Sequence, residues 1–121
     1  MSGALWEVEF TDEFGEWWST LTLDQQVSIT SAVEIVELRG PGLGRPLVDR
    51  IESSRHQHMK ELRIPQGNIR IFFAFDPLRN AILLIGGDKT GRWIEFYREM
   101  IPLADALYDE HLRILKREGK T

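Results

Sequence analysis

The sequence predicts an α+β protein: a small twisted antiparallel sheet with an N-terminal helical hairpin packed on one face and a C-terminal helix. Two observations carry this prediction. Apolar residues recur at helical spacing before residue 40 and after residue 100, whereas residues 58–85 alternate with the period of a strand. Clusters of turn-forming residues separate these segments, which gives the order β-α-α-β-β-β-α. With 121 residues and no internal repeat, we expect one domain over residues 1–121.

The first 40 residues predict one strand and two helices. Residues 5–10 alternate, and their apolar face comprises Trp6, Val8 and Phe10. A short amphipathic helix should begin near Thr11 or Asp12. Its core stripe comprises Phe14, Trp17, Trp18 and Leu21. Thr22 and Gln25 form a capping box for a second helix, which Gly40 and Pro41 should end. The buried stripe of that helix comprises Ile29, Ala32, Val33 and Val36.

The middle of the chain predicts three antiparallel strands, 58–64, 69–75 and 81–85, joined by turns at 65–68 and 76–80. In the second strand, Ile69, Ile71, Phe73 and Phe75 should face the helical hairpin. Arg70 should lie on the opposite face, which we expect the sheet to present. The third strand is apolar on both faces, as is typical of a central strand.

A helical period returns near the C-terminus. Pro102 is well placed for the first turn of the last helix. The inner stripe of that helix should comprise Leu103, Ala104, Leu107, His111 and Leu115.

Charge is distributed unevenly along the chain. The formal net charge is -4, which by itself argues against a nucleic-acid partner. However, residues 1–38 hold eight acidic residues and no Lys or Arg, whereas residues 39–98 hold eleven Lys and Arg against six acidic residues. Because local potential governs the binding of a polyanion, the second segment can present a basic face.

The composition also predicts a cellular compartment. The chain has no cysteine, which excludes disulfides and thiolate metal sites and favours a reducing cytoplasm. The sequence MSGALWEVEF lacks the features of a signal peptide, and no apolar stretch approaches about 18 residues. We therefore expect a cytoplasmic protein without a membrane partner.

Residues 58–110 resemble toxins of the RelE/HigB type, in particular the phage-derived HigB-like branch. The segments HMKELRI (58–64) and GNIRIFF (67–73) are similar to the core motif of that family. The apolar strand ILLIGGDK (82–89) and the later residues Trp93, Phe96-Tyr97 and Ile101-Pro102 also match its pattern.

The resemblance implies the toxin component of a toxin–antitoxin system. Such toxins are ribosome-dependent endoribonucleases that cut mRNA in the ribosomal decoding site, by attack of a 2′-hydroxyl on the adjacent phosphate. The reaction requires no metal and no cofactor. The implied partners are mRNA and a cognate antitoxin, expected to be a small helix-turn-helix protein that forms a hetero-oligomer with the toxin.

Several residues can supply the catalytic roles that this reaction requires. Arg63 and Arg70 lie on adjacent predicted strands, and guanidinium groups bind phosphate oxygens and stabilise their charge. Lys60 and Lys89 add positive potential, and a lysine near other cations can transfer a proton. Tyr97 matches an aromatic residue of the family, and His58 (or His56) could act as acid or base. Further RNA contacts are assigned to Arg45, Arg92 and Arg98.

Two other functions remain open. Related ParE-type toxins share the scaffold but act by binding a topoisomerase, and the set of Arg63, Arg70, Lys89 and Tyr97 counts against that reading. A non-enzymatic protein-binding module is the second alternative, and exposure of Trp17, Trp18 or Trp93 would favour it.

Overall fold

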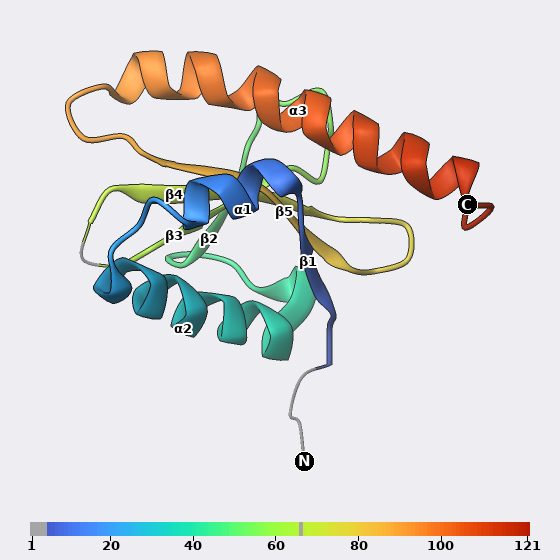
Figure 1. Ribbon diagram of the computed structural model, residues 1–121, viewed down its shortest axis with the longest axis horizontal. Coiled ribbons are helices and arrows are strands. Elements are labelled where there is room, and N and C mark those ends of the chain that lie inside the picture. Colours follow the sequence, from blue (N-terminus) through green and yellow to red (C-terminus); the bar gives the residue numbers. More distant parts are fainter. Residues whose placement is uncertain (1–4, 66) are drawn as a thin grey trace.

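The structure is a computed structural model that describes residues 5–65 and 67–121. Five strands form one open sheet in the order β1-β5-β4-β3-β2, and helices flank it (Figure 1). The elements are β1 (Val8–Phe10), α1 (Asp12–Trp18), α2 (Leu23–Arg39), the 3-10 turn η1 (Gly40–Gly42), β2 (Val48–Arg50), β3 (Lys60–Arg63), β4 (Ile69–Phe75), β5 (Ala81–Asp88) and α3 (Trp93–Arg117). The predicted α+β class is confirmed.

Helices cover both faces of the sheet. α2 lies along one face and α3 along the other, while α1 packs against β5 (Figure 1). In β4, Ile71 and Phe73 belong to the core on the α2 side, and Phe72 and Ala74 belong to the core under α3. All four are buried. The expectation that the second face is presented to solvent is therefore wrong for the centre of the sheet, because α3 covers it.

The sheet is mixed rather than wholly antiparallel. The predicted meander of β3, β4 and β5 is present, but β1 pairs with β5 in parallel. β2 was not predicted, because three residues are too few to establish an alternating pattern; it pairs with β3 and forms one edge of the sheet. β3 begins at Lys60 rather than at residue 58, and β5 continues to Asp88.

The two N-terminal helices follow their sequence signals closely. The Thr11 side chain caps α1 by accepting a hydrogen bond from the Phe14 amide, and the capping box of Thr22 and Gln25 is formed. Beyond α2, Gly40 adopts φ +65°, and a Cβ there would lie 2.2 Å from the ring of Trp6. The end of α2 therefore requires glycine.

α3 begins nine residues earlier than predicted, at Trp93, so Pro102 lies inside the helix. Proline interrupts the backbone ladder because it lacks an N–H group. Phe96 before it and Ala104 after it are both buried against the sheet, and these anchors maintain the helix across the interruption. Leu103 was placed on the inner stripe, but it is 41 % exposed.

Exposure of the aromatic residues differs in part from expectation. Trp17 and Trp18 pack against the core as predicted. Phe10 is 65 % exposed, because β1 forms an edge of the sheet, and Trp93 is 58 % exposed.

In the predicted turn at 65–68, Gln66 lies outside the described residues. Over residues 5–65 and 67–121, no helix combines the length and apolarity needed to cross a membrane.

Candidate functional site

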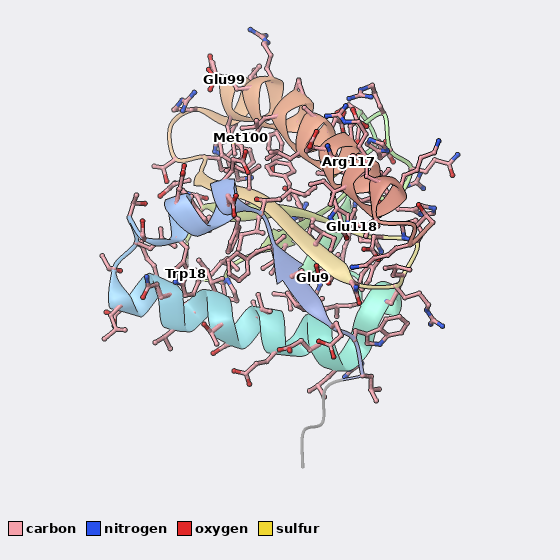
Figure 2. All side chains as sticks on the ribbon, turned by 45° about the vertical axis from the view of Figure 1, so that its right-hand side comes forward. Glu9, Trp18, Glu99, Met100, Arg117 and Glu118 are labelled. Atoms are coloured by element: carbon pink, nitrogen blue, oxygen red, sulfur yellow. The ribbon has the colours of Figure 1, made fainter. Side chains whose placement is uncertain are left out.

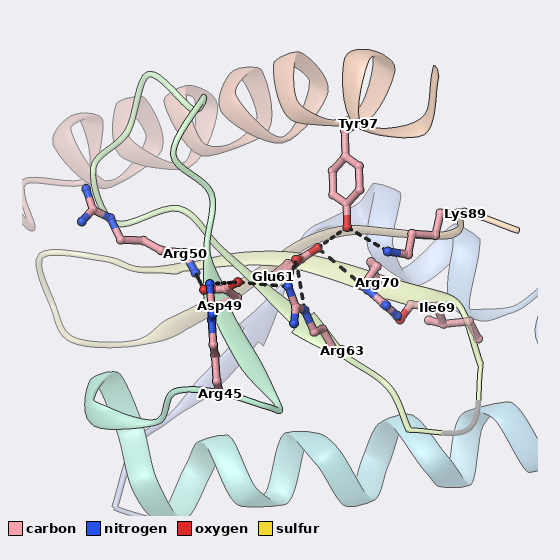
Figure 3. A network of polar contacts seen from close by, with 9 residues as sticks. All are labelled: Arg45, Asp49, Arg50, Glu61, Arg63, Ile69, Arg70, Lys89 and Tyr97. Atoms are coloured by element: carbon pink, nitrogen blue, oxygen red, sulfur yellow. Dashed lines mark hydrogen bonds and ion pairs between the residues drawn. The ribbon is translucent and has the colours of Figure 1, made fainter. Parts of the chain in front are cut away.

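A cluster of polar side chains lies between the end of the meander and the first turns of α3. Strand alternation places Glu61 and Arg63 on the α3 side of β3, and the β3–β4 register sets Arg63 directly opposite Arg70. Lys89 follows β5, and Tyr97 descends from α3 toward the same point (Figure 3). We call these five residues the Glu61 cluster.

The carboxylate of Glu61 is the centre of this cluster. Only 4 % of the residue is exposed. Its Oε1 accepts a hydrogen bond of 2.7 Å from the Tyr97 hydroxyl, and its Oε2 accepts two of 3.2 Å from Arg63 (Figure 3). The Nε of Arg70 is 4.0 Å from Oε1. A buried carboxylate needs such partners, because desolvation otherwise strongly disfavours its charge.

The Arg70 side chain is held in place, but not all of its hydrogen-bond donors have an acceptor among the described residues. Its Nη1 donates a hydrogen bond of 3.0 Å to the carbonyl oxygen of Ile69. Its Nε is buried and, among the described residues, has no hydrogen-bond partner. The Arg70 side chain is 11 % exposed, whereas that of Arg63 is 37 % exposed. The cluster thus has one buried cationic donor without an acceptor and one guanidinium open to solvent.

Lys89 is also buried, with 4 % of the residue exposed. Its Nζ lies 3.4 Å from the centre of the Trp93 ring and 3.5 Å from the Tyr97 hydroxyl. Burial lowers the pKa of Lys89, the positive charge of Arg70 lowers it further, and the charge of Glu61 opposes the shift. A lysine in this setting releases its proton more readily than one in water.

The pKa of Tyr97 is shifted in the opposite direction. Burial, together with the hydrogen bond to Glu61 and the charge of that residue, raises the pKa of Tyr97 to about 12. The phenol therefore keeps its proton at neutral pH, and its O–H group donates a hydrogen bond to Glu61. In this arrangement Tyr97 is a hydrogen-bond donor and not a base.

The structure does not bring Lys60 and His58 into the cluster. Lys60 alternates with Glu61 along β3, so it points to the other face of the sheet, and its Nζ donates to the carbonyl oxygen of Pro41 at 3.1 Å. His58 is exposed and lines a hollow together with Lys60 and Pro41. His56, the other histidine considered, contacts Asp109 on α3 at 2.7 Å.

The predicted RNA contacts divide into two groups. Arg45 is connected to the cluster, because Asp49 lies 3.2 Å from Arg45 and 3.0 Å from Arg63 (Figure 3). The hydrogen bond from Arg45 is the main cause that lowers the pKa of Asp49. Arg92 and Arg98 are both exposed near the start of α3, and Arg92 pairs with Glu99 at 2.7 Å.

Sequence reasoning missed three members of the site. Glu61 was given no role of its own, although its position two residues before Arg63 puts both side chains on one face of a strand. Asp49 lies on the unpredicted strand β2, and Trp93 gains its place under Lys89 only through the fold. Among the described residues, no group of three or more His, Cys, Asp or Glu side chains is arranged to hold a metal ion.

Solved structures with a similar fold define the class. The RelE–RelB complex from Pyrococcus horikoshii OT3 matches with a TM-score of 0.57 and 14% identity, over 72% of this chain and 97% of that one. The isolated RelE toxin from E. coli matches with a TM-score of 0.57 and 9% identity, over 78% and 98% of the two chains. The protein therefore has a RelE-like fold.

Sequence relatives give the family. Residues 16–109 match the family described as "Phage derived protein Gp49-like". "Putative toxin HigB3" of Mycobacterium tuberculosis is 51% identical over 74% of this chain and 78% of its own length. "Putative toxin HigB2" of the same organism is 45% identical over 84% of this chain, which spans about half (52%) of that relative. The chain belongs to the Gp49-like family of RelE/HigB-type toxins, as the motifs at 58–110 indicated.

Proposed function

We propose that the protein is the toxin of a toxin–antitoxin system and that it cuts mRNA on the ribosome in the cytoplasm. The relatives named as toxins and the RelE-like fold support the first part. The second part rests on one observation: three cations, Arg63, Arg70 and Lys89, surround a single buried carboxylate on one face of the sheet. An excess of positive charge at a site that is largely shielded from water favours the binding of a phosphate group.

Arg63 and Arg70 would bind the phosphate that is cut. The buried Nε of Arg70 lacks an acceptor among the described residues, and a phosphate oxygen would supply one. Arg63 is open enough to meet the RNA first, while Arg70 stabilises the additional negative charge that develops when the 2′-oxygen attacks phosphorus.

Proton transfer would fall to Lys89. In the reaction, the 2′-hydroxyl loses its proton to solvent water as its oxygen bonds to phosphorus. The bond from phosphorus to the 5′-oxygen then breaks, and that departing oxygen gains a proton. The lowered pKa of Lys89 suits donation to that leaving oxygen. Tyr97 and Glu61 act as positioning residues, because their hydrogen bond of 2.7 Å fixes the wall of the site beside Lys89.

A cognate antitoxin would be the partner that silences the toxin. Three of the solved RelE neighbours are antitoxin–toxin complexes, from Pyrococcus horikoshii, Methanococcus jannaschii and E. coli, and this supports a similar assembly here. A small helix-turn-helix protein encoded beside this gene remains our expected candidate.

The decisive experiment is inducible expression in a bacterial host, with primer extension on a reporter mRNA. We expect the wild type to arrest growth and to produce new 5′ ends only within translated codons. Arg70→Ala should reduce cleavage by about 100-fold or more, the usual cost of removing one transition-state donor. Arg113→Ala provides a matched control, because Arg113 is exposed near the far end of α3.

Two results would reject the nuclease. One is undiminished cleavage by Arg70→Ala, and the other is growth arrest with intact mRNA. Circular dichroism of both variants must show the wild-type fold for the comparison to hold.

The alternative of a non-enzymatic protein-binding module retains one supporting observation. Trp93 is 58 % exposed, which was the feature expected of a binding module. However, the ammonium group of Lys89 lies over the Trp93 ring, so part of the surface of that ring is already in contact within the site. Growth arrest with intact mRNA and accumulated DNA supercoiling defects would favour topoisomerase binding instead.

A further inference from the structure

β1 is an edge strand with an unused side. It pairs with β5 on one side, and among the described residues no strand pairs with the other. The Glu7 carbonyl oxygen and the Thr11 amide bond to β5, so by strand alternation the peptide groups of Val8 and Phe10 point outward. An exposed edge of this kind can accept a further strand from another chain.

Hollows flank this edge on both faces of the sheet. On the α2 side, a hollow of about 400 Å³ is lined mainly by apolar side chains, among them Phe14, Trp18, Ile29 and Val33. On the α3 side, a second hollow of about 380 Å³ contains Glu9, Asp12, Glu13 and Glu110 together with Leu107 and Ile114. Figure 2 shows β1, marked by Glu9, between α2 and α3.

The two hollows select different side chains. A strand added beside β1 would direct alternate residues to opposite faces of the sheet. Residues on the α2 side would enter the apolar hollow, and residues on the α3 side would meet carboxylates. Among residues 5–65 and 67–121, Glu9, Asp12 and Glu13 take part in no ion pair, although the Asn80 side chain donates a hydrogen bond of 3.0 Å to Glu9. Glu110 pairs with Arg113 and Arg117. Unpaired carboxylates favour Lys or Arg in the incoming strand.

We propose that the outer edge of β1 is a docking site for a partner strand in which apolar and basic residues alternate. The assignment of that strand to the cognate antitoxin rests on the proposed function above. A second copy of this chain is disfavoured as the occupant, because pairing of two β1 edges would bring the carboxylates of Glu7, Glu9 and Glu13 of one copy toward those of the other. The docking site lies on the acidic part of the molecule and not at the Glu61 cluster.

The test uses the full chain with Arg70→Ala, so that it can be produced without toxicity. The probe is a disulfide-closed β-hairpin peptide whose outer strand alternates Val with Lys, and its matched partner replaces Lys by Glu. Isothermal titration should give an affinity about tenfold or more in favour of the Lys hairpin. Amide NMR shifts should change at Val8 and Phe10.

Three variants locate the binding. Val8→Pro removes an outward N–H group without removing a hydrogen bond to β5, and it should weaken binding of the Lys hairpin about tenfold. Glu9→Lys combined with Glu13→Lys should also weaken that binding about tenfold. Glu52→Lys is the control for charge, because this exposed residue follows β2 at the opposite edge of the sheet. It should leave the affinity unchanged.

Equal affinity for the two hairpins, or binding that survives both β1 variants, would overturn the proposal. A dimer that dissociates on Val8→Pro would also overturn it, because a second copy would then be the occupant. In cells, the toxin with Glu9→Lys and Glu13→Lys should remain toxic, and its antitoxin should no longer neutralise it. If the wild type is not toxic at all, the proposed function fails, while the hairpin titration still decides the role of β1.

Discussion

At the scale of single residues, Glu61 organises the site although it adds no positive charge to it. Its carboxylate holds Arg63 and the Tyr97 hydroxyl in fixed positions, and it lies within reach of Arg70. The same charge raises the pKa of Tyr97 and opposes the lowering of the pKa of Lys89. One buried carboxylate therefore sets the protonation of two neighbours in the same direction, because a nearby negative charge favours the protonated form of any group.

Glu61→Gln should lower the pKa of Tyr97 from its value of about 12. The amide cannot repel the phenolate, but burial still keeps the pKa above the ordinary 10.0, because burial is the larger cause. A pH titration of tyrosinate absorbance measures the change. The chain has only two tyrosines, so Tyr97→Phe identifies the remaining transition as that of Tyr108. An unchanged Tyr97 transition in Glu61→Gln would contradict this account of the cluster.

From the sequence, strand alternation placed Arg70 on its face of the sheet, and the family resemblance named Tyr97; the catalytic roles of the site residues stay a prediction. Arg63, Arg70, Lys89 and Tyr97 were all named, and the structure brings them together. Lys60 was grouped with them because it is basic and close in sequence, but one step along a strand reverses the face. Trp93 could not be placed, since its contact with Lys89 depends on where α3 begins.

At the scale of elements, the accuracy of the predictions follows the length and completeness of the local signals. α2 has a capping box at its start and a glycine after its end, and β4 was predicted with its observed bounds. β2 has three residues and no such signal. The start of α3 was misplaced because Pro102 imitates the first turn of a helix, and only the packing of Phe96 on the sheet reveals the earlier turns.

The contact between α1 and β5 depends on a glycine, Gly86, which leaves room for the ring of Trp17. A Cβ at Gly86 would lie 2.3 Å from the ring of Trp17, which is itself packed against Phe14 with ring centroids 5.5 Å apart. Gly86→Ala should therefore destabilise the protein by about 1–3 kcal/mol, the usual cost of overpacking. Urea unfolding measures the loss. Gly44→Ala is the matched control, because a Cβ there meets nothing within 4 Å, and equal stabilities of the two variants would contradict the packing argument.

At the scale of the whole molecule, acidic and basic residues occupy different surfaces. The acidic first 38 residues form β1, α1 and most of α2, whereas the basic residues of the Glu61 cluster come from β3, β4 and the segment that leads into α3. A net charge of -4 is thus compatible with RNA binding, because the phosphate meets the local excess of positive charge. Under our proposals, the two surfaces would serve two partners, RNA at the basic one and a basic strand at the acidic one.

This separation predicts a shallow salt dependence of RNA binding. If Arg63, Arg70 and Lys89 make the phosphate contacts, the logarithm of affinity for a single-stranded RNA should fall with the logarithm of salt concentration with a slope of about -2. Fluorescence anisotropy of a labelled oligonucleotide measures this slope. Arg63→Ala should make it less steep by about 0.7, because one phosphate contact is lost, whereas Arg113→Ala should leave it unchanged. A slope that is the same in all three proteins would mean that RNA binds elsewhere, since the basic face would then contribute no phosphate contact through Arg63.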